Sequence, residues 1–204
     1  MKRPQFVVLV PVKAPALGKS RLHVPDHARP GLATAFALDA LHAARATPAV
    51  TEVVVVTDDA GFSSRCRELG IDTLPDGDGL NASLVDAAAA VRSRLPDATP
   101  VALCADLPCL GSEDLADALA QVAAGGSWFV ADAEGTGTTT YAAPYDAFAP
   151  RFGAGSRAAH AAGATPVVGD LLTLRRDVDD EATLAAAIRL GVGRFTREAA
   201  ALLP

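Results

Sequence analysis

The chain has 204 residues, of which 50% are hydrophobic and 21% charged, so it can bury one substantial core and we expect a single domain over residues 1–204. The formal net charge of -6 excludes a general nucleic-acid surface, which needs a basic stripe. Three cysteines do not make a disulfide framework, and no run approaches the roughly 20 apolar residues of a membrane helix, so we expect a cytoplasmic protein without nucleic-acid or membrane partners.

Short β-branched runs alternate with longer alanine-rich segments of helical period. This alternation is typical of βαβ units around a largely parallel sheet, and it predicts an α/β fold. We expect strands at residues 6–12, 52–57, 71–74, 100–105, 127–131 and 138–143. We expect helices at residues 32–46, 81–95, 113–124 and 183–190, with a last one near 196–202. In such sheets ligands bind beyond the carboxyl ends of the strands, so the loops after the strands carry the functional candidates.

The first of these loops reads VKAPALGKSRL and brings Lys13, Lys19, Ser20 and Arg21 together with a glycine. Three cations, a hydroxyl and backbone N–H groups can neutralise a polyphosphate. The spacing is not that of a Walker loop, and no G-x-G-x-x-G is present. The alternative is a solvated loop whose cations face water.

The second loop, DGDGLNASLVDA, is a glycine-rich turn that leads into a helix with Asn81 near its start. Asparagine is a good N-cap, and this is the simpler explanation of Asn81. The functional alternative is recognition of a base or ribose by Asn81 and the backbone of Gly77 and Gly79.

The third loop, VALCADLPCL, places Asp106 at the end of a buried apolar strand. A carboxylate there is costly to bury without a partner, and the partner could be a cation. Mg²⁺ typically takes one or two carboxylates together with substrate phosphates, so Asp106 would be half of such a site. The alternative is that Asp106 caps a turn or the helix near Glu113.

Two glycine-rich segments follow, GTGTTT and RFGAGSRAAH. Threonines suit a strand, but the lead-in at Gly137 and Thr138 also suits one wall of an anion pocket. Gly153 and Ser156 precede a short helical pattern, and a glycine-rich turn at a helix start is a natural anion site. His160 lies inside that helix, and we interpret it as a surface or core histidine, not a catalytic one.

The fourth loop, LRRDVDDEATL, carries Asp177, Asp179, Asp180 and Glu181 before a helix. Asp179 or Asp180 as N-cap, with acids in the first turn, needs no function. Asp177 lies before that cap, at the end of an expected extended run at residues 172–175. It is therefore the candidate for a second metal ligand.

Taken together and in this order, the loops resemble the 2-phospho-L-lactate guanylyltransferase family, which includes phosphoenolpyruvate guanylyltransferases of coenzyme F420 biosynthesis. The matching segments span nearly the whole chain and are VPVKAPALGKSRL, GDGLNASL, ADLPCL, GTGTTT, RFGAGSRAAH and RRDVDDEATL. The resemblance implies a nucleotidyltransferase fold of the glycosyltransferase-A-like kind, with a central mixed sheet between helices. Many relatives carry a threonine-proline pair after the second aspartate, and this chain lacks it.

Carried over residue by residue, the resemblance implies that Asp106 and Asp177 hold Mg²⁺. It implies phosphoenolpyruvate-binding positions at Thr138, Gly153 and Ser156. The implied nucleotide-binding positions are Lys13, Lys19, Ser20, Arg21, Gly79 and Asn81. Lys13, Lys19 and Asp106 would be the catalytic residues.

The implied activity joins GTP and phosphoenolpyruvate, releases pyrophosphate, and hands the product to a downstream phosphoacid transferase. One alternative is the same chemistry on 2-phospho-L-lactate or 3-phospho-D-glycerate, which spacing does not distinguish. An alternative of another class is a non-catalytic nucleotide-binding regulatory protein.

Overall fold

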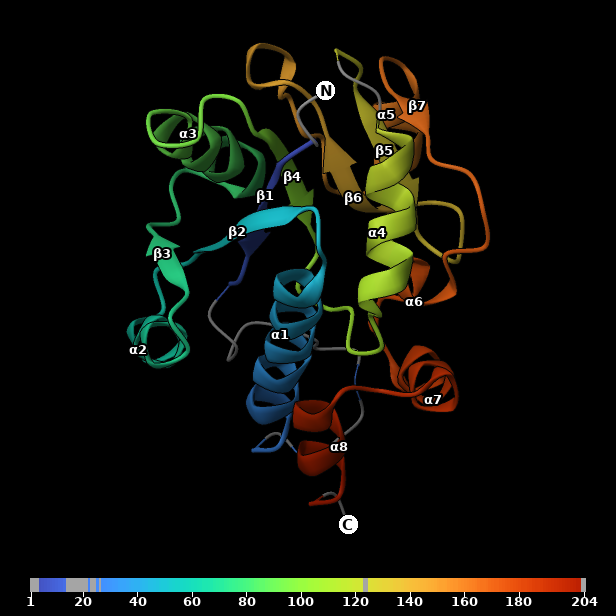
Figure 1. The fold of residues 1–204 in the computed structure, drawn as a ribbon. Coiled ribbons are helices and arrows are strands. Elements are labelled where there is room, and N and C mark those ends of the chain that lie inside the picture. The colour runs from blue at the N-terminus through green and yellow to red at the C-terminus, as the bar shows by residue number, and fades with distance from the viewer. Residues whose placement is uncertain (1–3, 14–21, 23–24, 26, 123–124, 203–204) are drawn as a thin grey trace.

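The computed structural model describes residues 4–13, 22, 25, 27–122 and 125–202 (Figure 1). Within these ranges a seven-stranded sheet has the order β3-β2-β1-β4-β6-β5-β7. Its strands are β1 (Phe6–Pro11), β2 (Val50–Val56), β3 (Asp72–Leu74), β4 (Thr99–Leu103), β5 (Trp128–Ala131), β6 (Thr138–Ala142) and β7 (Thr165–Pro166). The helices are α1 (Arg29–Ala46), α2 (Ala60–Glu68), α3 (Leu80–Arg92), α4 (Ser112–Gln121), η2 (Tyr145–Ala147), α5 (Ser156–Ala161), α6 (Leu172–Arg175), α7 (Glu181–Leu190) and α8 (Arg194–Ala200).

The direction of β6 distinguishes it from the other strands. Strand β1 pairs in parallel with β2 and β4, and β2 with β3, whereas β6 runs antiparallel between β4 and β5. Strand β7 is parallel to β5. The sheet is therefore mixed and mostly parallel, which confirms the expected α/β fold. Because β6 is reversed, its first residues lie at the edge where β4 and β5 end.

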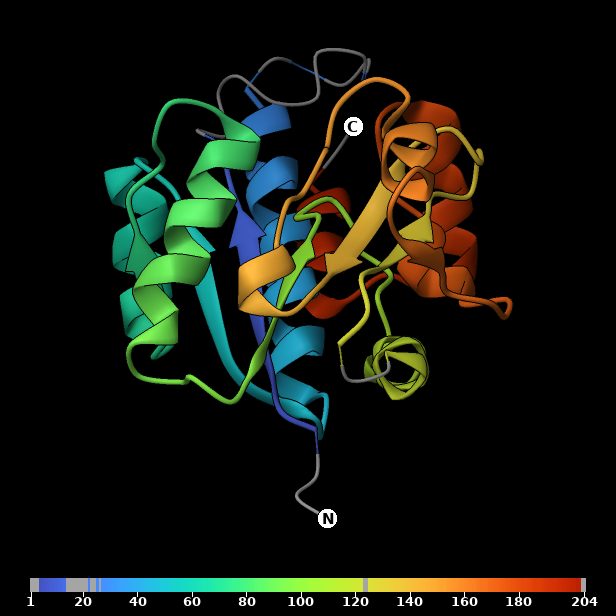
Figure 2. The same cartoon turned by 90° about the horizontal axis from the view of Figure 1, so that it is seen from above.

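Helices cover both faces of this sheet (Figure 2). Alternate residues of a strand face opposite sides. Val8 and Val10 of β1 accordingly belong to a core with α1 and α4, while Val7 and Leu9 belong to a core with α3. A third, smaller core joins α1 to α7, with Phe36 among its buried residues. None of the helices in the described ranges has both the length and the hydropathy of a membrane-spanning segment.

The structure corrects the expected elements in several places. Residues 172–175, expected to be extended, form helix α6. The carboxylate of Asp114 accepts hydrogen bonds from the Thr173 N–H at 2.7 Å and the Thr173 hydroxyl at 2.6 Å, which satisfies a donor in the first turn of that helix. Helix α2, which was not expected, has a weakly helical sequence but is capped by Asp59, which accepts from the Phe62 N–H at 2.6 Å.

Helix α8 begins two residues before the expected start near residue 196. The reason lies far away in the sequence. Asp39 of α1 is buried, and its carboxylate accepts from the N–H groups of Phe195 and Thr196 at 3.1 and 2.8 Å. A negative charge at a helix N-terminus is favourable, so Asp39 fixes where α8 starts.

Candidate active-site cleft

Several of the predicted site residues lie at the edge of the sheet where β4 and β5 end. Asp106 follows β4, and Asp132 follows β5 directly. Thr138 opens the reversed strand β6, and its pairing with Ala131 sets it at the same edge. The topology therefore brings carboxylates and a hydroxyl together from segments that are far apart in the sequence.

A cleft of about 680 Å³ opens at this edge. Five predicted site residues line it: Asp106, Thr138, Gly153, Ser156 and Asp177. A smaller cavity of about 230 Å³ adjoins it, shares Leu80, Cys104 and Asp106 with it, and has Lys13 among its lining residues. The predicted residues Lys19, Ser20 and Arg21 lie outside the described residues, and Gly79 and Asn81 do not line either cavity.

One side of the cleft is acidic, and we call it the acidic wall. It consists of Asp106, Asp132, Glu134, Asp177, Asp179 and Asp180. Among the described residues that line the cleft there is no lysine or arginine. Glu134 pairs with Arg176 at 3.0 Å, but the acidic wall keeps an excess of carboxylates over the described cations, which disfavours entry of a negatively charged ligand.

Three of these acids lie close enough to share a metal ion. One ligand atom each from Asp132, Glu134 and Asp177 lie within 4.8 Å of one another. Sequence reasoning selected Asp177 and missed Asp132 and Glu134, because acids in the glycine-rich segment DAEGTG are typical turn residues. Their position directly after a predicted strand was the signal that could have found them.

A backbone hydrogen bond brings the segment that carries Asp177 close to Asp106. The N–H of Val178 donates to the carbonyl oxygen of Asp106 at 3.0 Å, which sets the segment with Asp177 beside the end of β4. Burial, and then the charges of Asp106 and Glu134, raise the pKa of Asp177 to about 7. Its Oδ1 is buried and accepts no hydrogen bond from the described residues. A divalent cation would offset the repulsion between these carboxylates and would bind the buried Oδ1 of Asp177. These residues therefore fit a metal ion.

Another part of the lining, which we call the threonine wall, consists of Thr136, Gly137, Thr138, Gly153 and Ser156. Asp132 holds its first part, because its carboxylate accepts from the N–H groups of Thr136 and Gly137 at 2.9 and 2.6 Å. A Cβ on Gly137 would lie only 2.3 Å from Asp132 Oδ2. Glycine is therefore required at 137, since the carboxylate fills the space of a side chain.

The structure excludes one of the two alternatives that the sequence offered for Asn81. The N-cap of α3 is Gly79, with φ 109° and no side-chain cap, so the interpretation of Asn81 as N-cap is wrong. Its amide donates to the carbonyl oxygen of Phe152 at 3.0 Å and accepts from the Phe152 N–H at 2.8 Å. Asn81 thus ties α3 to the loop that carries Gly153, and its contact with a nucleotide stays a prediction.

Asp180 is the N-cap of α7, as one of the two sequence alternatives predicted. It accepts from the Thr183 N–H at 2.9 Å, and the Thr183 hydroxyl accepts from the Asp180 N–H at 3.0 Å. This capping box accounts for Asp180 without a functional role. Asp179 lies between this cap and Asp177.

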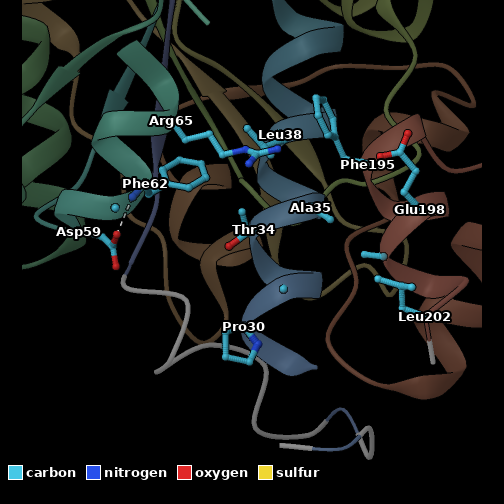
Figure 3. Close-up of a pocket in the computed structure, with 13 residues that line it drawn as sticks. Pro30, Thr34, Ala35, Leu38, Asp59, Phe62, Arg65, Phe195, Glu198 and Leu202 are labelled. Atoms are coloured by element: carbon cyan, nitrogen blue, oxygen red, sulfur yellow. Dashed lines mark hydrogen bonds between the residues drawn. The ribbon is translucent and has the colours of Figure 1, made fainter. Parts of the chain in front are cut away.

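A second hollow, of about 620 Å³, lies between α1, α2 and α8 (Figure 3). Its lining is mostly apolar, with Leu38, Phe62 and Phe195 among the side chains shown. Arg65 and Glu198 come from different helices on either side of it. The carboxylate of Asp59 is engaged in capping α2. Because no group of polar side chains converges there, the cleft between the acidic and threonine walls is the candidate active site.

Comparison with known proteins identifies the family of the chain. Residues 6–200 match the family model described as "Guanylyl transferase CofC like". The chain is 46% identical over 206 residues to a phosphoenolpyruvate guanylyltransferase of Streptomyces coelicolor, covering 98% of this chain and 97% of that protein. It is 44% identical to one of Thermomonospora curvata, over 97% and 89% of the two chains. Among solved structures, a 4-diphosphocytidyl-2C-methyl-D-erythritol synthase superposes with a TM-score of 0.63 at 14% identity, over 93% and 99% of the chains, which shows the fold alone.

Proposed function

The chain belongs to the CofC-like guanylyl transferase family, and from this premise we propose that it joins GTP to phosphoenolpyruvate and releases pyrophosphate. The observation that carries the substrate choice is the full-length match to phosphoenolpyruvate guanylyltransferases at 39–46% identity. Phosphoenolpyruvate is therefore preferred to 2-phospho-L-lactate and 3-phospho-D-glycerate. As a member of this family, the chain is a nucleotidyltransferase, which removes the non-catalytic alternative.

In the proposed reaction, a phosphate oxygen of phosphoenolpyruvate attacks the α-phosphorus of GTP. The new P–O bond forms as the bond to the β-phosphate oxygen breaks, and pyrophosphate leaves. No general base is required, because a phosphate monoester has its second pKa near ~6 and is already mostly dianionic at neutral pH. This agrees with a cleft whose described lining contains no histidine.

Different residues of the chain would bind the two substrates. Thr138, Gly153 and Ser156 would bind and orient the phosphoacid, since hydroxyl and backbone N–H groups suit anionic oxygens. Lys13 in the adjoining cavity, with Lys19, Ser20 and Arg21, would bind the triphosphate. Holding both substrates in line is where most of the rate acceleration is expected.

Asp106 and Asp177 would hold Mg²⁺, with Asp132 or Glu134 as a further ligand. The support is the buried Oδ1 of Asp177 and the gathering of three carboxylates within 4.8 Å. When bound, the ion supplies positive charge that offsets the repulsion between two anionic substrates.

The product would be an activated phosphoacid joined to a guanosine diphosphate group. A downstream transferase that moves the phosphoacid onto an acceptor of coenzyme F420 synthesis is the proposed consumer. The enzyme would work in the cytoplasm, where GTP is available.

The test measures pyrophosphate release with Mg²⁺ for GTP, CTP, ATP and UTP against phosphoenolpyruvate, 2-phospho-L-lactate and 3-phospho-D-glycerate. We expect the pair of GTP and phosphoenolpyruvate to give the highest kcat/KM by at least about tenfold. Asp106→Asn serves as the inactive control. No release with any pair would remove the proposed function, and a clear preference for another acid would change the substrate.

A further inference from the structure

His160 stands behind the threonine wall and has no part in the reaction proposed above. It lies on α5 and is only 2% exposed, which confirms its interpretation as a core histidine. Its ring packs against Tyr141, Phe129 and Phe152, at centroid distances of 4.8, 6.0 and 5.4 Å. An imidazole costs free energy to bury unless both nitrogens find partners, and here both do.

The first partner fixes which nitrogen carries the proton. The backbone N–H of Arg151 donates to Nε2 of His160 at 2.8 Å, so Nε2 acts as an acceptor. A neutral imidazole then keeps its proton on Nδ1. Burial lowers the pKa of His160, the nearby Ser156 backbone acts in the opposite direction, and the charge of Arg151 lowers it further. The ring is therefore neutral near pH 7, with Nδ1 as its donor.

The second partner is Thr138, whose Oγ1 lies 3.0 Å from Nδ1. Because Nδ1 is the donor, the threonine oxygen accepts. A hydroxyl has one hydrogen and two lone pairs, so the hydrogen of Thr138 must be directed elsewhere. Thr138 also lines the cleft, where an anionic oxygen is the acceptor that such a hydrogen would meet.

We propose that His160 is a positioning residue for the phosphoacid: it fixes the Thr138 hydroxyl as a hydrogen-bond donor toward the cleft. Its other nitrogen holds Arg151, two residues before Gly153, so one ring orders both the strand and the loop of the threonine wall. The inference rests on the proposed function, because it takes the ligand of Thr138 to be the phosphoacid. It predicts an effect on phosphoenolpyruvate and not on GTP.

Two amide substitutions separate the tasks of the two nitrogens. His160→Asn keeps an N–H donor near the place of Nδ1 but offers no acceptor to Arg151. His160→Gln offers an acceptor near the place of Nε2 but no donor to Thr138. We expect the KM for phosphoenolpyruvate to rise about tenfold in H160Q and less than about threefold in H160N, with the KM for GTP changed less than about twofold in both. Equal effects in the two variants, or a larger effect on GTP, would overturn the proposal.

A double-mutant cycle tests whether His160 acts through Thr138. Thr138→Val removes the hydroxyl at nearly constant volume. In that background H160Q should raise the KM for phosphoenolpyruvate less than about twofold, because no hydroxyl remains to be oriented. A further tenfold rise would mean that His160 acts on another group, which contradicts the proposal.

Folding and function are checked in the same series. Far-UV circular dichroism and GTP binding report whether each variant keeps its fold. His160→Leu, which also lacks a donor, replaces H160Q if the glutamine variant does not fold, and the same tenfold rise is expected. Absence of phosphoenolpyruvate-dependent pyrophosphate release by the wild-type protein would count against the proposed function. Normal wild-type release with no effect in H160Q and H160L would count against His160 alone.

Discussion

The two walls of the cleft are built on opposite principles. In the threonine wall, neighbouring side chains already hold the polar groups: Asp132 accepts from the Gly137 N–H, and His160 lies within hydrogen-bond distance of Thr138. In the acidic wall, carboxylates are crowded, and burial and neighbouring charges raise the pKa of Asp177 to about 7. The threonine wall is thus held in place before a ligand arrives, whereas the buried carboxylate of Asp177 in the acidic wall would be stabilised by a bound cation.

The largest expected effect is the loss of enzyme activity when an aspartate of the acidic wall is replaced. Asp106→Asn and Asp177→Asn keep the side-chain shape but remove the charge that would hold Mg²⁺. We expect kcat to fall about a hundredfold or more in each, measured as pyrophosphate release at saturating substrates. Either variant with near-normal turnover would show that its carboxylate has no part in catalysis.

In the threonine wall, a side chain added at Gly137 should lower the stability of the protein by steric conflict. In Gly137→Ala the new Cβ would lie 2.3 Å from Asp132 Oδ2, so the loop must shift. We expect a loss of about 2 kcal/mol in the free energy of unfolding, measured with urea. Gly163→Ala is the matched control, because its Cβ would meet nothing within 4 Å. If both variants lost the same amount, the contact with Asp132 would not be the reason for glycine at 137.

Removing a charge from the acidic wall should stabilise the metal-free protein. The folded pKa of Asp177, about 7, lies above its ordinary value of 3.8, so the folded protein keeps a proton that the unfolded chain releases. Wild-type stability therefore falls as the pH rises from about 4 to about 7. The Asp177→Asn variant cannot ionise at this position, so its stability does not decline in this way. At pH 8 we expect it to be more stable than the wild type by on the order of 1–2 kcal/mol, and at pH 5 by less.

Urea unfolding of the metal-free proteins at both pH values measures this difference. Asp78→Asn is the control, since that side chain is exposed. A variant at Asp177 that was less stable than the wild type at pH 8 would contradict the description of the acidic wall.

Asn81 connects α3 to the loop that carries Gly153 of the threonine wall. Asn81→Ala removes the two hydrogen bonds to the Phe152 backbone. We expect the KM for phosphoenolpyruvate to rise about tenfold and the KM for GTP less than about threefold. A rise confined to GTP would instead support the prediction that Asn81 binds the nucleotide.

The smallest effect concerns pH and His160. Its folded pKa is lowered by burial, so the folded protein excludes a proton that the unfolded chain takes up below about pH 6.5. Stability should be fully present above that pH and decline as the pH falls below it. Thermal unfolding between pH 7 and pH 5 should show a smaller decline in His160→Asn, in a comparison at constant ionic strength. Equal declines would assign the pH dependence to other groups.

Much of this arrangement could be predicted from the sequence. The strands are β-branched and buried, so their periodicity predicted all of the sheet except the two-residue β7. Asp177 was selected after an expected extended run that is in fact helix α6, whereas polar residues at the ends of predicted strands indicated Asp106 and Thr138. These inferences succeeded because each depends on neighbours in the sequence.

What could not be predicted depends on contacts between distant segments. Asn81 pairs with Phe152, 71 residues away, and no spacing rule distinguishes that contact from a cap or a nucleotide contact. Asp39 sets the start of α8 across 157 residues, and Asp114 satisfies a donor of α6 across 59. Local propensity is a weak guide at such places, because tertiary contacts decide the conformation.

The most direct test of the account is phosphoenolpyruvate binding with and without a divalent cation. Titration calorimetry of the wild-type protein in Mg²⁺ and in EDTA isolates the acidic wall from the chemical step. We predict at least about tenfold weaker binding in EDTA, because the acidic wall then faces the anionic substrate without the positive charge of a divalent ion. Equally tight binding in EDTA would contradict the claim that the acidic wall must be neutralised before the substrate can enter.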